Sequence, residues 1–304
     1  MPCYFPLSAY RSATRDERGK YAIAFSPFQN GVSSDLHLQL PCGRCIGCRL
    51  ERSRQWAVRC MHEASLHDNN SFITLTYSDD HLPRDGSLHV RDFQLFMKRL
   101  RKHFGANIRF YHCGEYGSKY GRPHYHAIIF GLDFLDKKLW KVDRGNKLYT
   151  SPKLDQIWGK GWAVIGNVTF DSAAYVARYI MKKVLGEAAD AYYERFDLMT
   201  GEVYRLKPEY TTMSRRPGIA HDWYMKFKHD TYKDDTVVQR GIKMKPPRYY
   251  DRLFEAEFPS DFQKIKHSRV REARKKSFDN TRDRLIVKHE LAQARVSRLK
   301  RIIE

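Results

Sequence analysis

The sequence predicts an α+β fold with an antiparallel sheet and with helices on one face of that sheet. Between residues 71 and 186, patterns typical of strands and helices follow one another in the order β-α-β-β-β-α. Consecutive strands joined by short connections favour antiparallel pairing, because parallel neighbours need a long crossover. A cysteine-rich segment precedes this region, and a strongly basic segment follows it.

The first strand and the first helix have the clearest patterns. SFITLTY (71–77) is rich in β-branched and aromatic residues and lies between turn-forming residues, which predicts a strand. Apolar residues recur at helical spacing in VRDFQLFMKRLRKHFG (90–105), where Gly105 is expected to end the helix.

The other elements of this region follow from the same rules of spacing and capping. Two strands at 107–113 and 124–131 flank a glycine-rich connection. The remaining expected elements are a hairpin at 137–152, a short helix from Ser151-Pro152 to Trp158, a strand at 161–170, and a helix at 171–186 with Asp171 as N-cap and Gly186 after its last turn.

Composition divides the 304 residues into three parts. Residues 1–67 hold the cysteine-rich segment and a basic amphipathic helix, residues 68–230 form the α+β domain, and residues 231–304 form a basic, largely helical extension. Lys and Arg number 55 against 35 Asp and Glu, a formal charge of +20, which favours a nucleic-acid partner. No stretch has the roughly 20 apolar residues of a membrane span, and the N-terminus lacks a signal-peptide core. We therefore expect an intracellular protein without a membrane partner.

Two histidines in the strand at 124–131 are the first candidates for a site. His124 and His126 are two residues apart, so they project from the same face of the strand. Glu115 lies nine residues earlier, and it comes beside His124 if the two strands pair across the glycine-rich connection. One carboxylate and two imidazoles suit a divalent cation such as Mg²⁺ or Mn²⁺ with positions open for substrate.

The helix at 171–186 carries two tyrosines and a lysine on one narrow arc. Tyr175 and Tyr179 are four residues apart, and Lys182 follows three residues later. A tyrosine hydroxyl, with a pKa near 10, attacks phosphorus at neutral pH only beside a cation or a metal ion. The simpler alternative is that both tyrosines pack in a core and the lysine is solvated.

The cysteine-rich segment PCGRCIGCR (41–49) predicts a structural metal site. Cys42, Cys45 and Cys48 have the spacing C-x₂-C-x₂-C, which is typical of metal ligands in a reducing compartment. Zinc needs a fourth ligand, and Cys3 is the best choice because Cys60 and Cys113 fit a helix and a strand. An iron–sulfur cluster is the alternative.

Basic and aromatic residues near the glycine-rich connection and the tyrosine helix are expected to contact single-stranded DNA. Tyrosine rings stack on bases, and cationic side chains follow the phosphates. The candidates are Arg122, Arg178, Lys183, Tyr116 and Tyr120.

In combination, these motifs resemble the HUH endonucleases, whose fold is RRM-like. They are most similar to the rolling-circle replication initiators of gokushovirus-type microviruses, which are single-stranded DNA phages. The resemblance covers about residues 40–190, and it depends on PCGRCIGCR, on HCGEYG with RPHYHAIIFG, and on YVARYIMKK. It implies that Glu115, His124 and His126 bind the catalytic metal, that Tyr175 and Tyr179 are nucleophiles, and that Lys182 steadies phosphate charge.

The resemblance also implies an activity. Such a protein nicks the origin, becomes linked to the 5′ phosphate through a tyrosine, and rejoins strands to circularise viral DNA in the host cytoplasm. No Walker-type phosphate loop is present, so we expect a host helicase and a host polymerase as partners. The alternatives are an HUH transposase or plasmid initiator, and a non-catalytic zinc-containing protein that binds single-stranded DNA. The oligomeric state is not predicted.

Overall fold

The structure is a computed structural model that describes residues 3–17, 21–28, 32–117, 120–143, 145–178, 188–196 and 201–298. Its contacts group into two compact units. One unit contains the described residues up to Arg52 together with those from Lys264 onward, and the other contains Ser53–Gln263. The boundaries that composition suggests, after residues 67 and 230, stay a prediction.

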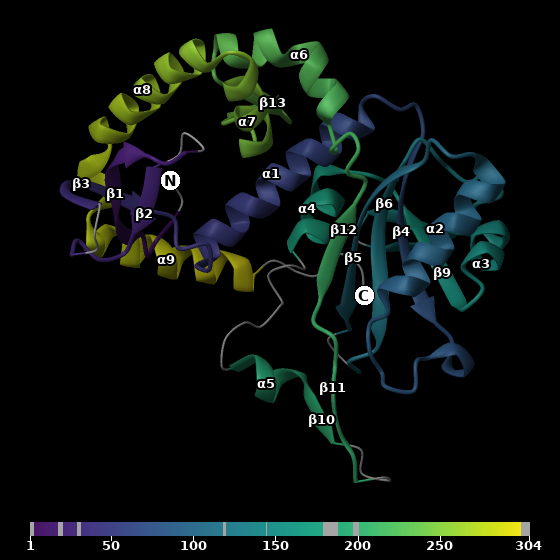
Figure 1. Cartoon of the computed structure of the whole chain (residues 1–304). Coiled ribbons are helices and arrows are strands. Elements are labelled where there is room, and N and C mark those ends of the chain that lie inside the picture. Colours follow the sequence, from purple (N-terminus) through teal and green to yellow (C-terminus); the bar gives the residue numbers. More distant parts are fainter. Residues whose placement is uncertain are drawn as a thin grey trace. The chain divides into compact units, whose positions relative to one another are not determined.

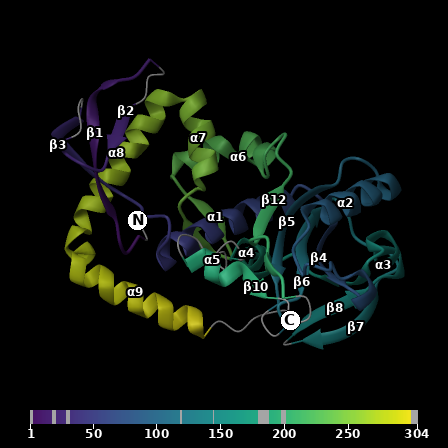
Figure 2. The same cartoon turned by 60° about the horizontal axis from the view of Figure 1, so that its bottom comes forward.

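The larger unit is built on a seven-stranded sheet in the order β12-β5-β6-β4-β9-β8-β7 (Figures 1 and 2). Every pair of neighbouring strands is antiparallel, which confirms the predicted fold class. The strands are β4 (Asn70–Tyr77), β5 (Arg109–Tyr116), β6 (Pro123–Phe130), β7 (Lys138–Asp143), β8 (Asn146–Thr150), β9 (Gly161–Gly166) and β12 (Tyr210–Met213).

Helices cover both faces of this sheet, although the sequence predicts them on one face (Figure 1). On one face, α2 (Val90–Phe104) and α3 (Pro152–Trp158) pack in the main apolar core. On the other face, Trp56 of α1 (Ile46–Ala64) stacks on Tyr111, and Tyr175 of α4 (Phe170–Arg178) lies against His126. The reason is visible in β6, where every residue except His124 is buried, so that both of its faces need a cover.

The N-terminus of α4 is capped by Thr169, not by Asp171 as the sequence predicts. The backbone N–H of Ser172 donates to Oγ1 of Thr169 over 3.1 Å, and the N–H of Thr169 donates to Oγ of Ser172 over 2.8 Å. This reciprocal pair satisfies two N–H groups at the helix start, so Asp171 is left in the first turn, where it pairs with Arg240. Residues 179–187 of the predicted helix lie outside the described residues.

Polar contacts attach α1 to the rest of the larger unit. Glu63 accepts hydrogen bonds from Arg109 of β5 and from the backbone N–H of Ala220, and Arg59 donates to the carbonyl of Ile219. The other elements of this unit are η1 (Asp79–His81), α5 (Ala188–Tyr193), β10 (Glu194–Phe196), β11 (Val203–Arg205), α6 (His221–Lys233), β13 (Val237–Gln239), β14 (Ile242–Met244), α7 (Arg248–Glu257) and the start of α8 (Pro259–Lys275).

The smaller unit has a three-stranded antiparallel sheet in the order β2-β1-β3, the first turns of α1, and the C-terminal helices. Its elements are β1 (Leu7–Arg15), β2 (Tyr21–Ala24), β3 (Val32–Leu40), the end of α8, η3 (Ser277–Asn280) and α9 (Arg282–Ser297). The predicted basic helical extension is therefore present. Among the described residues, no helix combines the length and the apolar content needed to span a membrane.

Candidate active site and cysteine cluster

Glu115, His124 and His126 converge on one face of the large sheet, and we call them the Glu–His–His trio. In the register of β5 and β6, Glu115 lies opposite His124, as the sequence predicts. Oε1 of Glu115 is 2.9 Å from Nε2 of His124 and 2.9 Å from Nε2 of His126. Three potential ligand atoms thus lie within 4.8 Å of one another, from two adjacent strands.

The other ring nitrogens of both histidines are held by the protein. Nδ1 of His124 is 3.1 Å from the carbonyl oxygen of Arg122, and Nδ1 of His126 is 2.9 Å from Oγ1 of Thr74. A carbonyl oxygen only accepts, so Nδ1 of His124 donates to Arg122, and Nε2 is the ring nitrogen that points at Glu115. Nε2 of both rings and Oε1 of Glu115 thus lie close together, and the protein holds the outer nitrogens, so the trio fits a metal ion.

The electrostatic setting keeps Glu115 ionised. Burial acts to raise the pKa of this carboxyl group, but hydrogen bonds with His124 and His126 outweigh burial and bring the pKa to about 2. The set therefore offers one anionic oxygen and two nitrogens, which are ligands that Mg²⁺ and Mn²⁺ accept.

Tyr175 lies beside the trio, on α4. Its ring centroid is 5.3 Å from that of His126 and 6.4 Å from that of Phe72, and only 5% of the residue is exposed. Ser53 of α1 donates a hydrogen bond of 3.0 Å to the carbonyl of Ala174, which fixes the turn that carries Tyr175. Tyr179, Lys182 and Lys183 lie outside the described residues, and Arg178, at the end of α4, is partly exposed.

Comparisons with known proteins show the family to which the chain belongs. A family model described as replication-associated protein ORF2/G2P matches residues 70–184. The replication-associated protein ORF2 of Spiroplasma virus 4 is 35% identical over 91% of this chain and 88% of its own length. The chain belongs to the family of microvirus replication-associated proteins. Two other members are VP4 of Bdellovibrio phage phiMH2K, 34% identical over 85% of this chain and 79% of its own, and ORF4 of Chlamydia phage 1, 34% identical over 70% and 53%.

No solved structure matches the chain. The segment that matches the family model of these replication-associated proteins contains the trio and the residues Tyr175, Tyr179 and Lys182, and it starts after the cysteine-rich segment.

A pocket of about 630 Å³ opens beside the trio. The β5–β6 connection forms one wall, and it also touches the trio, since a Cβ on Gly117 would lie 3.5 Å from Cε1 of His124. The second wall comes from α5, β10 and β11. The lining residues are Leu82, Gly86, Tyr116, Gly117, Tyr120, Gly121, Arg122, Pro123, Tyr192, Tyr193, Arg195, Tyr204 and Leu206.

Three of the residues expected to contact DNA line this pocket, but they differ in exposure. Tyr120 is 76% exposed. The hydroxyl of Tyr116 donates to the carbonyl of Lys207 over 2.7 Å and accepts from the N–H of Leu88. Arg122 is bound to Asp79 and to the carbonyl of Tyr77. Within the protein, Tyr116 and Arg122 thus shape the wall, while Tyr120 presents a ring to solvent.

Sequence patterns did not indicate several residues of the site. Thr74 orients His126 and Ser53 holds α4, and both follow only from the observed packing. The second pocket wall carries Tyr192, Arg195 and Tyr204, which lie more than 60 residues after the trio in short elements without marked periodicity.

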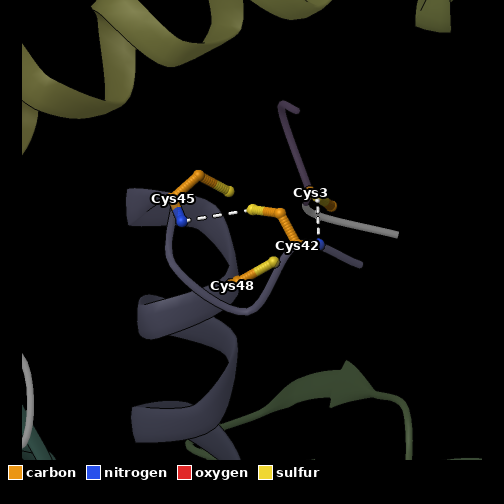
Figure 3. Close-up of side chains that lie close together, drawn as sticks. All are labelled: Cys3, Cys42, Cys45 and Cys48. Atoms are coloured by element: carbon orange, nitrogen blue, oxygen red, sulfur yellow. Dashed lines mark hydrogen bonds between the residues drawn. The ribbon is translucent and has the colours of Figure 1, made fainter. Parts of the chain in front are cut away.

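The four cysteines that the sequence selects lie together (Figure 3). The Sγ atoms of Cys3, Cys42, Cys45 and Cys48 are within 4.8 Å of one another, and we call this set the cysteine cluster. Cys42, Cys45 and Cys48 surround the start of α1, and Cys3 approaches from a separate segment (Figure 3). Cys60 and Cys113 are buried in the larger unit, so the choice of Cys3 agrees with the geometry.

Proposed function

We propose that this protein initiates rolling-circle replication as an HUH endonuclease that nicks and rejoins single-stranded viral DNA. The observation that carries the proposal is the Glu–His–His trio with Tyr175 packed against His126. A family of replication-associated proteins is the setting in which a nickase is expected.

In the nicking step, a tyrosine hydroxyl attacks the scissile phosphate. A bond forms between the tyrosine oxygen and phosphorus, the bond from phosphorus to the 3′ oxygen breaks, and that oxygen takes up a proton while the phenol gives one up. The 5′ phosphate stays on the protein. The phosphotyrosine ester conserves the energy of the broken bond, so rejoining needs no ATP.

Other residues of the chain would bind the metal, orient its ligands and supply the nucleophiles. The trio would hold Mg²⁺ or Mn²⁺, which supplies Lewis-acid polarisation of the scissile phosphate. Thr74 and the carbonyl of Arg122 would keep Nε2 of both imidazoles directed at the metal. The burial of the trio would exclude competing water. Tyr175 and Tyr179 would act in turn, one for the first nick and the other for the junction formed after synthesis, with Lys182 at the phosphate.

Single-stranded DNA would pass along the pocket lined by Tyr120 and Tyr192 to reach the trio. Tyr120 and Tyr192, which is 45% exposed, offer rings for stacking, and Arg178 at the end of α4 offers positive charge, as Lys183 would. Replacing Tyr120 by alanine should weaken binding of single-stranded DNA about 5-fold or more. Trp140→Ala is the matched control, since Trp140 is 55% exposed on β7 at the opposite edge of the sheet and should leave binding unchanged.

The protein would act in the cytoplasm of the host cell, with a host helicase separating strands and a host polymerase extending the 3′ end. The alternatives predict other behaviour. A DNA-binding protein without catalysis would bind the origin and leave it uncut, and a transposase or plasmid initiator would act on origins other than the phage origin.

The test is a nicking assay with origin DNA labelled at its 5′ or 3′ end and with Mn²⁺. The wild type should give an adduct that resists denaturation and carries only the fragment 3′ of the nick. Glu115→Gln should reduce nicking at least about 100-fold, because the charged ligand is lost. Asp92→Asn is the control, since Asp92 accepts a hydrogen bond from Tyr77 on the other face of the sheet and should leave nicking intact. If the origin DNA is bound but stays uncut, the protein is a non-catalytic DNA-binding protein and not a nickase.

A further inference from the structure

The cysteine cluster lies outside the segment that matches the family model, and the proposed nicking reaction makes no use of it. We propose that Cys3, Cys42, Cys45 and Cys48 bind one structural Zn²⁺ ion that holds the smaller unit together. This proposal does not depend on the nickase activity.

The register of the small sheet explains how ligands 39 residues apart meet. Leu7 of β1 pairs with Leu40 of β3. Cys3 lies four residues before this pair and Cys42 two residues after it, so the antiparallel pairing of β1 with β3 brings both to the same end of the sheet. The chain then enters α1, whose first turn contributes Cys48.

Backbone groups around the cluster already point at sulfur. The backbone N of Cys42 lies 3.3 Å from Sγ of Cys3, and that of Cys45 lies 3.3 Å from Sγ of Cys42 (Figure 3). The backbone N of Tyr4 lies 3.4 Å from Sγ of Cys45. Backbone N–H groups that point at cysteine sulfur are the kind of outer-shell contact that orients ligands around a metal ion.

The positive charge of neighbouring residues supports the same conclusion. Four thiolates around Zn²⁺ leave two net negative charges, and Arg44 and Arg49 lie within and directly after the cysteine motif. The first turn of α1 contains no acidic residue that would oppose these thiolates.

The spacing of the sulfur atoms favours one ion over an iron–sulfur cluster. Four ligands at about 2.3 Å around tetrahedral zinc are separated from each other by about 3.8 Å. The four sulfur atoms of the cysteine cluster all lie within 4.8 Å of one another, which is compatible with this arrangement. A cluster of several iron and sulfide atoms needs the cysteines farther apart, so we favour zinc over the iron–sulfur alternative that the sequence left open.

The smaller unit has a physical need for such a cross-link. Its described sheet buries few side chains, among them Ala9, Ser12 and Ala24, while larger apolar residues are exposed. A three-stranded sheet with so little apolar burial gains little stability from packing alone. The exposed apolar residues are Phe5, Leu7, Ile23, Phe25 and Phe28.

A metal that joins the segments flanking β1 and β3 at one end of this sheet to α1 would supply the missing stability, because its binding energy contributes directly to folding. Four protein thiolates also fill a tetrahedral site, which leaves no position for substrate. The role is therefore structural.

The first experiment measures metal content in the full-length protein, purified from zinc-supplied cells, by elemental analysis. We expect one zinc per chain in the wild type and in Cys60→Ala and Cys113→Ala, which remove buried thiols outside the cluster. The double variant Cys42→Ser/Cys45→Ser should carry no zinc, and proteases should then cut within residues 3–40. Zinc-free wild type, zinc retained by the double variant, or iron with sulfide would overturn the proposal.

A second measurement does not depend on whether a cysteine variant folds. Wild type produced with Co²⁺ in place of zinc should show the intense visible and near-ultraviolet absorption of tetrahedral cobalt with four thiolates. Bound cobalt with the weak spectrum of oxygen and nitrogen ligands would contradict the assignment.

Discussion

The Glu–His–His trio and the cysteine cluster both gather metal-ligating side chains, but the chain holds them by different means. The trio lies on paired strands of a sheet that is packed on both faces, so the fold itself sets the distances between its ligands. The cysteine cluster lies at one end of a small sheet that buries few side chains. In the larger unit the fold positions the site, whereas in the smaller unit we infer that the site stabilises the fold.

The two sites should therefore respond differently to a chelator, and this is the largest expected effect. A brief treatment with EDTA should abolish nicking, because the trio offers only three protein ligands and exchanges its metal with solvent. Added Mn²⁺ should restore nicking fully. Elemental analysis of the same samples should find one zinc per chain throughout, because a site closed by four thiolates releases its ion slowly. Nicking that survives EDTA would show that the trio acts without a metal.

The next effect concerns the support of the trio. Thr74→Ala removes the hydroxyl that holds Nδ1 of His126, which should weaken Mn²⁺ affinity about 10- to 100-fold without changing the sheet. Nicking measured against Mn²⁺ concentration should show the shift. Thr74→Ser keeps the hydroxyl and should behave as wild type. An equal loss in both variants would mean that Thr74 contributes packing and not orientation.

The smallest effect concerns the helix that carries Tyr175. Ser53→Ala removes the hydrogen bond to the carbonyl of Ala174 and should lower the free energy of unfolding by about 1 kcal/mol. Adduct formation should slow by a few-fold because α4 is less firmly placed. Ser65→Ala is the matched control, since Ser65 donates only to the nearby carbonyl of His62. Thermal unfolding and single-turnover nicking should be measured for both variants. Equal nicking rates in the two variants would show that Ser53 does not position α4.

Local patterns made much of the fold and of the trio predictable. The two-residue period of a strand placed His124 and His126 on one face, and the short connection fixed Glu115 opposite His124. Cys3 followed from excluding two cysteines that fit regular elements. The placement of the trio was predictable because it depends on neighbours in sequence and on one hairpin, whereas the choice of Cys3 was made by elimination.

What the sequence did not reveal depends on packing between distant segments. The helices were expected on one face, because the order of elements does not show that β6 is buried on both sides. Asp171 was expected as the N-cap, but Thr169 and Ser172 satisfy the same groups reciprocally. The pocket wall with Tyr192 and Tyr204, and the support from Thr74, arise only when remote segments meet.

The central claim is that Tyr175 or Tyr179 becomes covalently linked to DNA. The most direct measurement is mass spectrometry of the trapped adduct after nuclease and trypsin digestion. Arg178 separates the two tyrosines, so Tyr175 falls in peptide 161–178 and Tyr179 in peptide 179–182. We predict a nucleotide 5′-phosphate on one of these two peptides, and its loss when that tyrosine is changed to phenylalanine. Cleavage without a covalent nucleotide, or a nucleotide on a residue outside both peptides, would contradict the claim.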